Sequence, residues 1–184
     1  MELTKFIVFL RNINISGKNK IAMSDLRIEF EKLGYRDVST YLNSGNVMFS
    51  SYENDIKVLK KDIEKMIVNN FGFTSPVYVI ESKRLNRIIE ASPIWWGTYD
   101  KNKYDNLILI LTDDAPNTLL NLIGPVSEGL EKIQIFENVI FWTFERNAHQ
   151  KCNWWKKTAT NGIAEKLTIR TSNTVKNLCQ RCIN

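Results

Sequence analysis

The sequence has few of the features from which common membrane segments and nucleotide sites are built. Its longest early apolar stretch, residues 6–10, lies between Lys5 and Arg11 and is too short for a membrane span or the core of a signal peptide. Neither a GxxxxGK[ST] nor a GxGxxG pattern is present. We therefore expect no membrane association and neither of the standard phosphate-binding loops.

Cysteine and histidine are also scarce. Only three cysteines occur, Cys152, Cys179 and Cys182, so one must stay unpaired in any disulfide scheme. This usage is typical of a reducing compartment, and we expect a cytoplasmic protein. The sole histidine, His149, precedes Cys152 with the spacing His-x-x-Cys, and Cys179 precedes Cys182 with the spacing Cys-x-x-Cys. Zinc ligands often have these spacings. Both pairs fall in expected helices, where buried thiols act as small hydrophobes and a redox pair would lack its usual helix N-terminus, so we predict no metal and no cofactor.

Charge gives only a broad indication of partners. The chain has 25 Lys and Arg against 20 Asp and Glu, a formal net charge of +5. Acidic residues are interspersed throughout, and no long basic run exists. Anionic molecules are therefore favoured as partners, but none is specified.

The chain is long and apolar enough for a sizeable core, with 184 residues of which 43% are hydrophobic. In its first part, side-chain periodicity predicts strands at 5–10, 38–42, 47–49 and 77–80, and helices at 24–34 and 56–72. We expect Ser24 to cap the first helix and Gly72 to end the second. Segment 43–46, rich in asparagine and glycine, predicts a hairpin turn.

The second part repeats the order β-α-β-β-α-β. Strands are expected at 106–111, 132–136, 139–144 and 167–170, with a helix from Pro116, a partly helical segment at 148–166 and a terminal helix after Ser172. Two such units predict an α+β fold of two ferredoxin-like (β-α-β-β-α-β) subdomains packed together. We place the N-terminal ferredoxin-like subdomain at 1–80, a connector at 81–104, and the C-terminal ferredoxin-like subdomain with its terminal helix at 105–184.

Three stretches resemble a known family. FLRNINISGKNKIAMSDLRIEFEKLGYRDVSTYLNSGNVMF resembles a signature in which an LRGINVGG-like stretch precedes KNxxxM and a TYxxSGNxxF hairpin. ASPIWWGTYDKNKYDNLILIL looks like the connector and strand of a subgroup, and RTSNTVKNL is similar to a closing arginine, asparagine and threonine motif. The family is the bacterial, uncharacterised "domain of unknown function 1697", and the resemblance implies two ferredoxin-like halves without an established activity, substrate or catalytic residue.

The family commonly has glycine where this chain has Asn12. Asparagine tolerates a left-handed backbone better than most residues, so Asn12 could adopt the left-handed conformation that a glycine would supply there. Its side chain would, however, obstruct a ligand that approaches the backbone closely.

One end of the first subdomain is expected to gather polar loops, because segments 11–20, 43–46 and 69–75 lie at the same end of a ferredoxin-like sheet. Glycine-containing turns can point backbone N–H groups at a phosphate, while Lys and Arg supply positive charge. The same residue types also build ordinary turns, so a purely structural role stays open. The candidate ligand-binding residues are Arg11, Asn12, Asn14, Gly17, Lys18, Lys20, Asn43, Ser44, Gly45 and Asn46.

A second candidate surface is segment 146–157, in which four basic residues accompany Trp154 and Trp155. Such a mixture can contact nucleic-acid backbones and stack bases. We favour core packing beneath a solvated basic face over such contact, since Cys152 and Trp155 have helical spacing. Strands 6–10 and 107–111 are apolar on both faces, which argues against an open RNA-recognition sheet.

No catalytic group can be assigned from the sequence. His149 has no recognisable partner, and Asp113 and Asp114 suit the N-terminus of the helix that begins near Pro116. The leading hypothesis is a non-enzymatic binder of a phosphate-bearing ligand, either a small molecule or nucleic acid, at the N-terminal loop end. A transferase-like enzyme that uses the same loops as a substrate cradle and a protein-interaction module are the alternatives, and the oligomeric state is left open.

Overall fold

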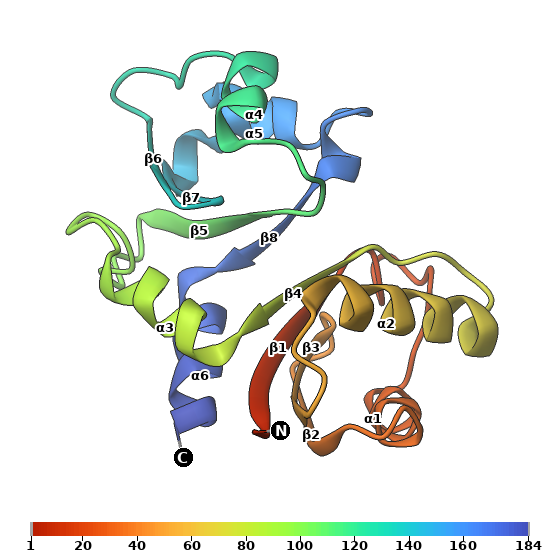
Figure 1. The fold of residues 1–184 in the computed structure, drawn as a ribbon. Coiled ribbons are helices and arrows are strands. Elements are labelled where there is room, and N and C mark those ends of the chain that lie inside the picture. Colours follow the sequence, from red (N-terminus) through yellow and green to blue (C-terminus); the bar gives the residue numbers. More distant parts are fainter. Residues whose placement is uncertain (1, 184) are drawn as a thin grey trace. The chain divides into compact units, whose positions relative to one another are not determined.

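The computed structural model describes residues 2–183, and the chain forms two compact units. The first comprises Met1–Asn86 with Leu178–Asn184, and the second comprises Arg87–Asn177. Each unit contains one four-stranded antiparallel sheet with helices (Figure 1). The strand orders are β2-β3-β1-β4 and β6-β7-β5-β8, which are the same arrangement when each sheet is read in chain order. The predicted α+β fold with two ferredoxin-like halves is confirmed.

The first unit is built on β1 as its central strand. Its strands are β1 (Thr4–Leu10), β2 (Arg36–Tyr41), β3 (Asn46–Ser51) and β4 (Val77–Glu81), and its helices are α1 (Met23–Lys32) and α2 (Ile56–Phe71). β1 pairs antiparallel with β3 on one side and with β4 on the other. Both helices lie on one side of the sheet (Figure 1), where alternate β1 residues, Phe6, Val8 and Leu10, enter a common apolar core. This alternation is the period of two that a strand imposes on its side chains.

The ends of the two helices differ in how well the sequence predicts them. The N-cap of α1 is Ala22, which offers no side-chain cap, and Ser24 lies inside the first turn. The prediction that Ser24 caps this helix is therefore wrong. α2 starts at the N-cap Asp55, whose carboxylate accepts a hydrogen bond of 2.8 Å from the N–H of Lys57. It ends as predicted at Gly72, which has a φ of 77°.

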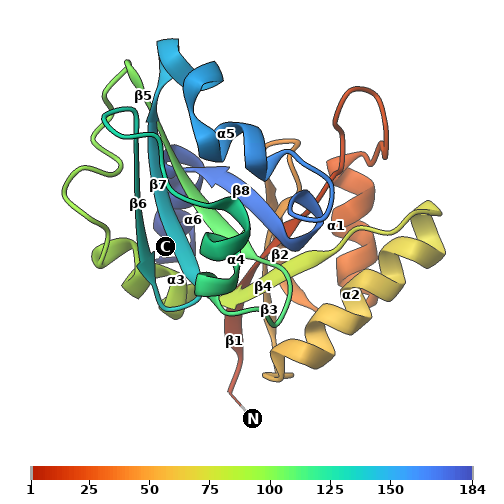
Figure 2. The same cartoon turned by 90° about the horizontal axis from the view of Figure 1, so that it is seen from above.

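The second unit repeats the pattern with shorter helices. Its elements are β5 (Lys103–Ile110), α4 (Pro116–Ile123), β6 (Glu131–Phe136), β7 (Val139–Glu145), the 3₁₀ segment η1 (Arg146–Lys151), α5 (Asn153–Thr158), the 3₁₀ segment η2 (Ala164–Lys166) and β8 (Leu167–Thr171). Figure 2 shows α4 and α5 close to this sheet, and residues of both helices pack with β5 and β7 in one apolar core. Trp142 and Trp154 are the largest fully buried side chains in it.

Two helices contribute residues to both units, α3 (Ser82–Glu90) and α6 (Ser172–Ile183). α3 lies in segment 81–104, for which the sequence interpretation gives no helix, although Leu85 and Ile88 are buried at helical spacing. The last turns of α6 group with the first unit, so the boundaries of the units differ from the expected division at 80 and 105. Within residues 2–183, each helix is too short or too polar to cross a bilayer.

Candidate functional site

The loops that follow β1, join β2 to β3 and precede β4 meet at one end of the first sheet. Leu10 is the last residue of β1 and pairs with Val77, the first residue of β4. Just beyond, the N–H of Leu10 donates to the carbonyl of Gly45 at 2.7 Å, and the N–H of Arg11 donates to the carbonyl of Pro76 at 3.0 Å. We call the three segments 11–20, 43–46 and 69–75 the loop end.

The exposed tip of the loop end is a small hairpin at residues 14–19. The N–H of Lys18 donates to the carbonyl of Ile15 at 2.9 Å, and the N–H of Asn14 donates to the carbonyl of Asn19 at 3.1 Å. Between them, Ser16 and Gly17 have φ values of 48° and 77°. Two successive residues with positive φ are the mark of a type I′ turn, which two-residue hairpins favour. The sequence interpretation misses this hairpin because Ser-Gly is a weaker turn signal than Asn-Gly.

Asn14 fastens this hairpin to its neighbours. Its side-chain amide donates to the carbonyls of Ile21 at 3.0 Å and Asn43 at 2.9 Å, and its Oδ1 accepts from the N–H of Ile21 at 2.9 Å. Asn14 therefore joins segments 11–20 and 43–46 directly. Both N–H donors of its amide and one acceptor position of Oδ1 are used in these internal bonds, so Asn14 positions the tip.

Gly45 and Asn46, both expected ligand residues, hold the second hairpin closed. Asn46 is the first residue of β3 and is fully buried, and its amide donates to the carbonyl of Tyr41 at 2.9 Å and to Oγ of Ser44 at 3.0 Å. Gly45 has a φ of 76°, and a Cβ there would lie 2.8 Å from Cβ of Leu10. The structure thus gives both residues a packing role, with no exposed side-chain group for a ligand.

Positive charge at the loop end comes from Arg11, Lys18 and Lys20. Both lysines are exposed, and Arg11 is half-buried. A Cβ at Gly17 would lie 3.9 Å from Cε of Lys20, so the Lys20 side chain runs back along the tip. No ion pair or hydrogen bond joins the lysines to segment 43–46 in the described part of the chain. Lys18 and Lys20 therefore belong to the tip of residues 14–19 and make no contact of these kinds with the hairpin turn at 43–46.

Backbone donors are available at the same tip. Across residues 2–183, the N–H groups of Ser16 and Gly17 have no hydrogen-bond partner, and both residues are exposed. Asn12 has a φ of 58°, so it occupies a left-handed position where glycine is common. Successive N–H groups in a turn make an anion-binding surface when they point outward together. The tip therefore combines unbonded donors with two cationic side chains.

Two residues that the sequence interpretation leaves out also support the loop end. The Asn19 side chain donates to the carbonyl of Asn12 at 2.9 Å, and the buried Ser75 hydroxyl donates to the carbonyl of Arg11 at 2.6 Å. Asn19 has a φ of 48°. The readiness of asparagine to adopt such a backbone was the available signal for Asn19, whereas Ser75 gave none of its own.

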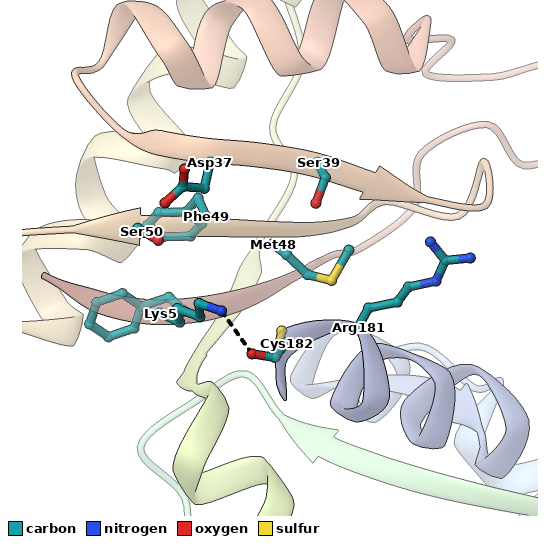
Figure 3. A pocket seen from close by; sticks show the side chains of 9 residues that line it. Lys5, Asp37, Ser39, Met48, Phe49, Ser50, Arg181 and Cys182 are labelled. Carbon is teal, nitrogen blue, oxygen red and sulfur yellow. Dashed lines mark hydrogen bonds between the residues drawn. The ribbon is translucent and has the colours of Figure 1, made fainter. Parts of the chain in front are cut away.

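A separate cavity of about 120 Å³ lies on the same unit, near the first residues of β1 (Figure 3). Nζ of Lys5 donates to the carbonyl of Cys182 at 3.0 Å, in the last turn of α6, where helix carbonyls carry partial negative charge. Arg181 lies over the Tyr41 ring, with Cζ 4.8 Å from its centre. Both cations thus have partners, and the cavity is smaller than sites for drug-sized ligands usually are.

Two of the three cysteines, Cys152 and Cys182, have thiols whose pKa values are raised by burial. Burial raises the pKa of Cys182, an effect that nearby Lys5 partly offsets. Burial and then the charge of Glu131 raise the pKa of Cys152. These thiols stay protonated at neutral pH, whereas nucleophilic attack and metal ligation need the thiolate. Among residues 2–183, no three His, Cys, Asp or Glu side chains gather as metal ligands would.

The basic aromatic segment 146–157 has a different helical register from the expected one. The chain is extended at Cys152, between η1 and α5, so helical spacing does not continue across it. Trp154 faces the core, and Trp155 is 43% exposed with its ring centre 5.1 Å from that of His149. The expectation that Trp155 packs in the core is wrong. His149 Nδ1 lies 2.8 Å from the carbonyl of Arg146, which can only accept, so Nδ1 carries the proton.

Comparison with known proteins identifies the family of this chain. The family described as "protein of unknown function (DUF1697)" has a model that matches residues 3–141. The chain belongs to this family. The match confirms the resemblance recognised in the sequence, and it includes the whole loop end of this DUF1697 protein. It ends before the RTSNTVKNL segment.

Solved structures extend the comparison to the fold. The conserved bacterial protein SP0830 from Streptococcus pneumoniae is similar over 97% of this chain and 98% of its own, with a TM-score of 0.85 at 22% identity. An unknown protein from Galdieria sulphuraria aligns over 92% of this chain and 98% of its own at 11% identity, but the TM-score is 0.27. The first likeness shows that the two proteins share a fold, and the second is too weak to support any inference. No protein of curated function matches this DUF1697 chain.

Proposed function

We propose that this protein is a binding protein for a phosphate-bearing ligand, which it holds at the tip formed by residues 14–19. The observation that supports the proposal is the pair of unbonded N–H groups at Ser16 and Gly17, set in a type I′ turn beside Lys18 and Lys20. Phosphate oxygens accept hydrogen bonds from such donors, and nearby cations strengthen each bond. Arg11 adds a third positive charge at the base of the tip.

The rigidity of the tip favours binding. Asn14 and Asn19 tie it to the sheet end by side-chain hydrogen bonds, so the donors are held before a ligand arrives. A ligand that meets a preorganised surface does not lose affinity to ordering that surface. The exposed position of the tip suits a ligand that approaches from solvent, either a small phosphate compound or a nucleic-acid backbone.

No disulfide joins Cys152, Cys179 or Cys182 within residues 2–183, which favours a reducing compartment, so we propose the cytoplasm as the place of this function. Phosphate-bearing molecules of both kinds are abundant there. The proposal involves binding alone and includes no chemical step.

Removal of both lysines tests the proposal. In Lys18→Ala/Lys20→Ala, affinity for inorganic pyrophosphate, measured by calorimetry, should fall roughly tenfold, because two charge-assisted contacts are lost. The melting temperature should barely change, since exposed charges contribute little to folding. The matched control is Lys61→Ala/Lys65→Ala on α2, which removes the same charge from exposed positions and should bind as the wild type does. Equal losses in both double variants, or no binding by the wild type, would contradict the proposal.

Salt dependence then separates nucleic acid from a small ligand. If the ligand is nucleic acid, the Lys18/Lys20 double variant should show a dependence of log affinity on log salt that is shallower by about one to two units. Fluorescence anisotropy with labelled single-stranded and duplex oligonucleotides measures this slope. Absence of binding to both at low salt would exclude nucleic acid and leave a small phosphate compound as the ligand.

A further inference from the structure

Segment 146–157 of the second unit, which includes η1 and most of α5, exposes cations and contains no Asp or Glu. We call its exposed side chains the basic aromatic surface. Within the part of the chain that the structure describes, none of its cations forms a salt bridge. Such uncompensated charge attracts an anionic partner. The exposed cations are Arg146, Lys151, Lys156 and Lys157.

Nearby acidic side chains leave this charge in place. Glu131 is 4% exposed, and its carboxylate accepts hydrogen bonds from the N–H groups of Ser127 and Trp154. Glu145 comes directly before the segment, is partly buried and joins no salt bridge among residues 2–183. The basic aromatic surface therefore keeps a net positive charge.

Trp155 gives the surface an aromatic ring that the core does not enclose. Of the five tryptophans, all of which lie in the described residues, only Trp155 is exposed. Its ring centre lies 5.4 Å from that of Phe144, a buried residue of β7, and 5.1 Å from that of His149. The indole is therefore supported by a buried strand residue, while 43% of Trp155 stays accessible to a partner.

The neighbouring Trp154 shows how a tryptophan with a purely structural role is placed in this segment. Trp154 is fully buried, and its Nε1–H donates to the carbonyl of Gly124 at 3.0 Å. Nε1 of Trp155 has no hydrogen-bond partner in the described part of the chain. The helical spacing that favoured core packing therefore explains neither the exposure of Trp155 nor its lack of a polar contact.

Arg146 is held in a fixed orientation by the same group of rings. Its Cζ lies 4.1 Å from the centre of the Tyr104 ring, and that centre lies 5.3 Å from the centre of the Phe144 ring. Phe144 thus contacts both Tyr104 and Trp155. A guanidinium that is stacked on a ring can still donate from its N–H edges to phosphate oxygens. A cation and an aromatic ring are therefore positioned together before a ligand arrives.

We propose that the basic aromatic surface binds single-stranded nucleic acid. One base stacks on the indole of Trp155, Arg146 donates to a phosphate, and the three lysines neutralise neighbouring phosphates. An acidic protein segment would use the cations and leave the indole uncovered. A duplex keeps its bases inside the helical stack, away from the indole. A single strand is therefore the polyanion that uses both the charge and the ring.

Fluorescence anisotropy on the full chain tests the choice of partner. The probes are labelled ten-nucleotide single strands of DNA and RNA, and a DNA duplex of the same sequence. A single strand should bind at least about fivefold more tightly than the duplex, because it offers a base without unpairing. Poly-glutamate, which carries charge and no bases, should compete poorly. Equal affinity for single strand and duplex, or full displacement by poly-glutamate at equal charge concentration, would overturn the proposal.

Substitutions at Trp155 isolate the stacking contact. Trp155→Ala should weaken single-strand binding roughly tenfold, and Trp155→Phe, which keeps a ring, should stay within about threefold of the wild type. The matched control is Tyr52→Ala in the first unit, since Tyr52 is also 43% exposed and also lies beside an arginine, Arg36. The control should bind as the wild type does. Melting curves confirm that the variants fold, and equal losses in Trp155→Ala and Tyr52→Ala would contradict the role of Trp155.

Salt dependence separates the lysines from the ring. Lys156→Ala/Lys157→Ala should make the dependence of log affinity on log salt shallower by about one to two units, because counterions are released only at phosphate contacts. Trp155→Ala should lower the affinity and leave this slope unchanged. Equal changes of slope in the two variants would contradict the separate roles.

The Lys18→Ala/Lys20→Ala variant distinguishes this surface from the tip of residues 14–19, with which it shares no residue. Single-strand affinity should be unchanged in that variant, whether or not the tip binds pyrophosphate. Loss of single-strand binding there would assign the nucleic acid to the tip and overturn the basic aromatic surface as its site. So would failure of the wild type to bind any single strand with a Kd below about 0.1 mM at low salt.

Discussion

At the scale of single residues, asparagine takes conformations that glycine commonly supplies. Asn12, Asn14 and Asn19 have φ values of 58°, 54° and 48° in one short segment. Asparagine tolerates the left-handed region better than most residues, and its amide can bond to nearby backbone groups. The side chains of Asn14 and Asn19 do so here. The segment between β1 and α1 is therefore more firmly held than a glycine loop would be.

Two glycines of the loop end should respond differently to a methyl group. Gly17 and Gly45 have φ values of 77° and 76°, so alanine is strained at either position. Only at Gly45 would the new Cβ collide with neighbours, since Cβ of Leu10 and Cδ1 of Ile13 lie 2.8 Å from it. Gly17→Ala should therefore cost about 1 kcal/mol of unfolding free energy, and Gly45→Ala about 2–4 kcal/mol. Urea unfolding measures both, and equal costs would show that packing at Gly45 is looser than the structure indicates.

Side-chain roles at the loop end were harder to predict than the position of the loops. Alternating strands and the order of the elements sufficed to place segments 11–20 and 43–46 at one end of a sheet. The contact of Asn14 with the carbonyl of Asn43 joins residues 29 positions apart in the chain, and no local pattern specifies it. The burial of Asn46 also depends on tertiary contacts, so the sequence could not reveal it. The turn composition of segment 43–46 was recognisable.

At the scale of secondary structure, periodicity predicted the elements well where they are long. α2 and β1 lie close to their expected bounds because their apolar residues recur over several turns or alternate over the whole strand. Segment 146–158 is less regular, because the backbone is extended at Cys152, between η1 and α5. The helical spacing of Cys152 and Trp155 therefore does not place them on one helix face. Short helical pieces contain too few residues to define a period.

The two helix starts in the first unit provide a matched pair of substitutions. Asp55→Ala removes an observed cap, the 2.8 Å bond to the N–H of Lys57, and should lower the unfolding free energy by about 1 kcal/mol. Ser24→Ala alters an exposed side chain that caps nothing and should change it by less than about 0.5 kcal/mol. Thermal and urea unfolding of both variants measure the difference. A loss of unfolding free energy above about 0.5 kcal/mol in Ser24→Ala would indicate that Ser24 caps α1, as the sequence suggested.

At the scale of the whole molecule, the two units share a topology without a recognisable shared sequence. The strand orders β2-β3-β1-β4 and β6-β7-β5-β8 are equivalent, yet the loop that follows β1 forms a hairpin tip and the loop that follows β5 leads directly to Pro116 of α4. A candidate site in one unit is therefore not expected at the corresponding place in the other. Element order could predict the duplication, because it depends on periodicity, and side-chain chemistry could not, because it differs between the units.

Removal of metal should leave the whole molecule unchanged. The pKa values of Cys152 and Cys182 are raised by burial, and each thiol would have to lose its proton and its packing to ligate zinc. We therefore expect the purified protein to contain less than stoichiometric zinc and to melt at the same temperature with and without a chelator. Metal analysis and calorimetric melting measure these quantities. A chelator-sensitive melt with one bound zinc per chain would show that the cysteines bind metal.

The central claim is that the N–H groups of Ser16 and Gly17 receive a phosphate, and a nuclear magnetic resonance titration tests it most directly. Increasing concentrations of inorganic pyrophosphate are added to uniformly ¹⁵N-labelled full-length protein, and the amide resonances of both residues are followed. The account predicts large, saturable shifts at Ser16 and Gly17 that are reduced in Lys18→Ala/Lys20→Ala and retained in Lys61→Ala/Lys65→Ala. Unchanged resonances at Ser16 and Gly17 at saturating pyrophosphate would contradict it.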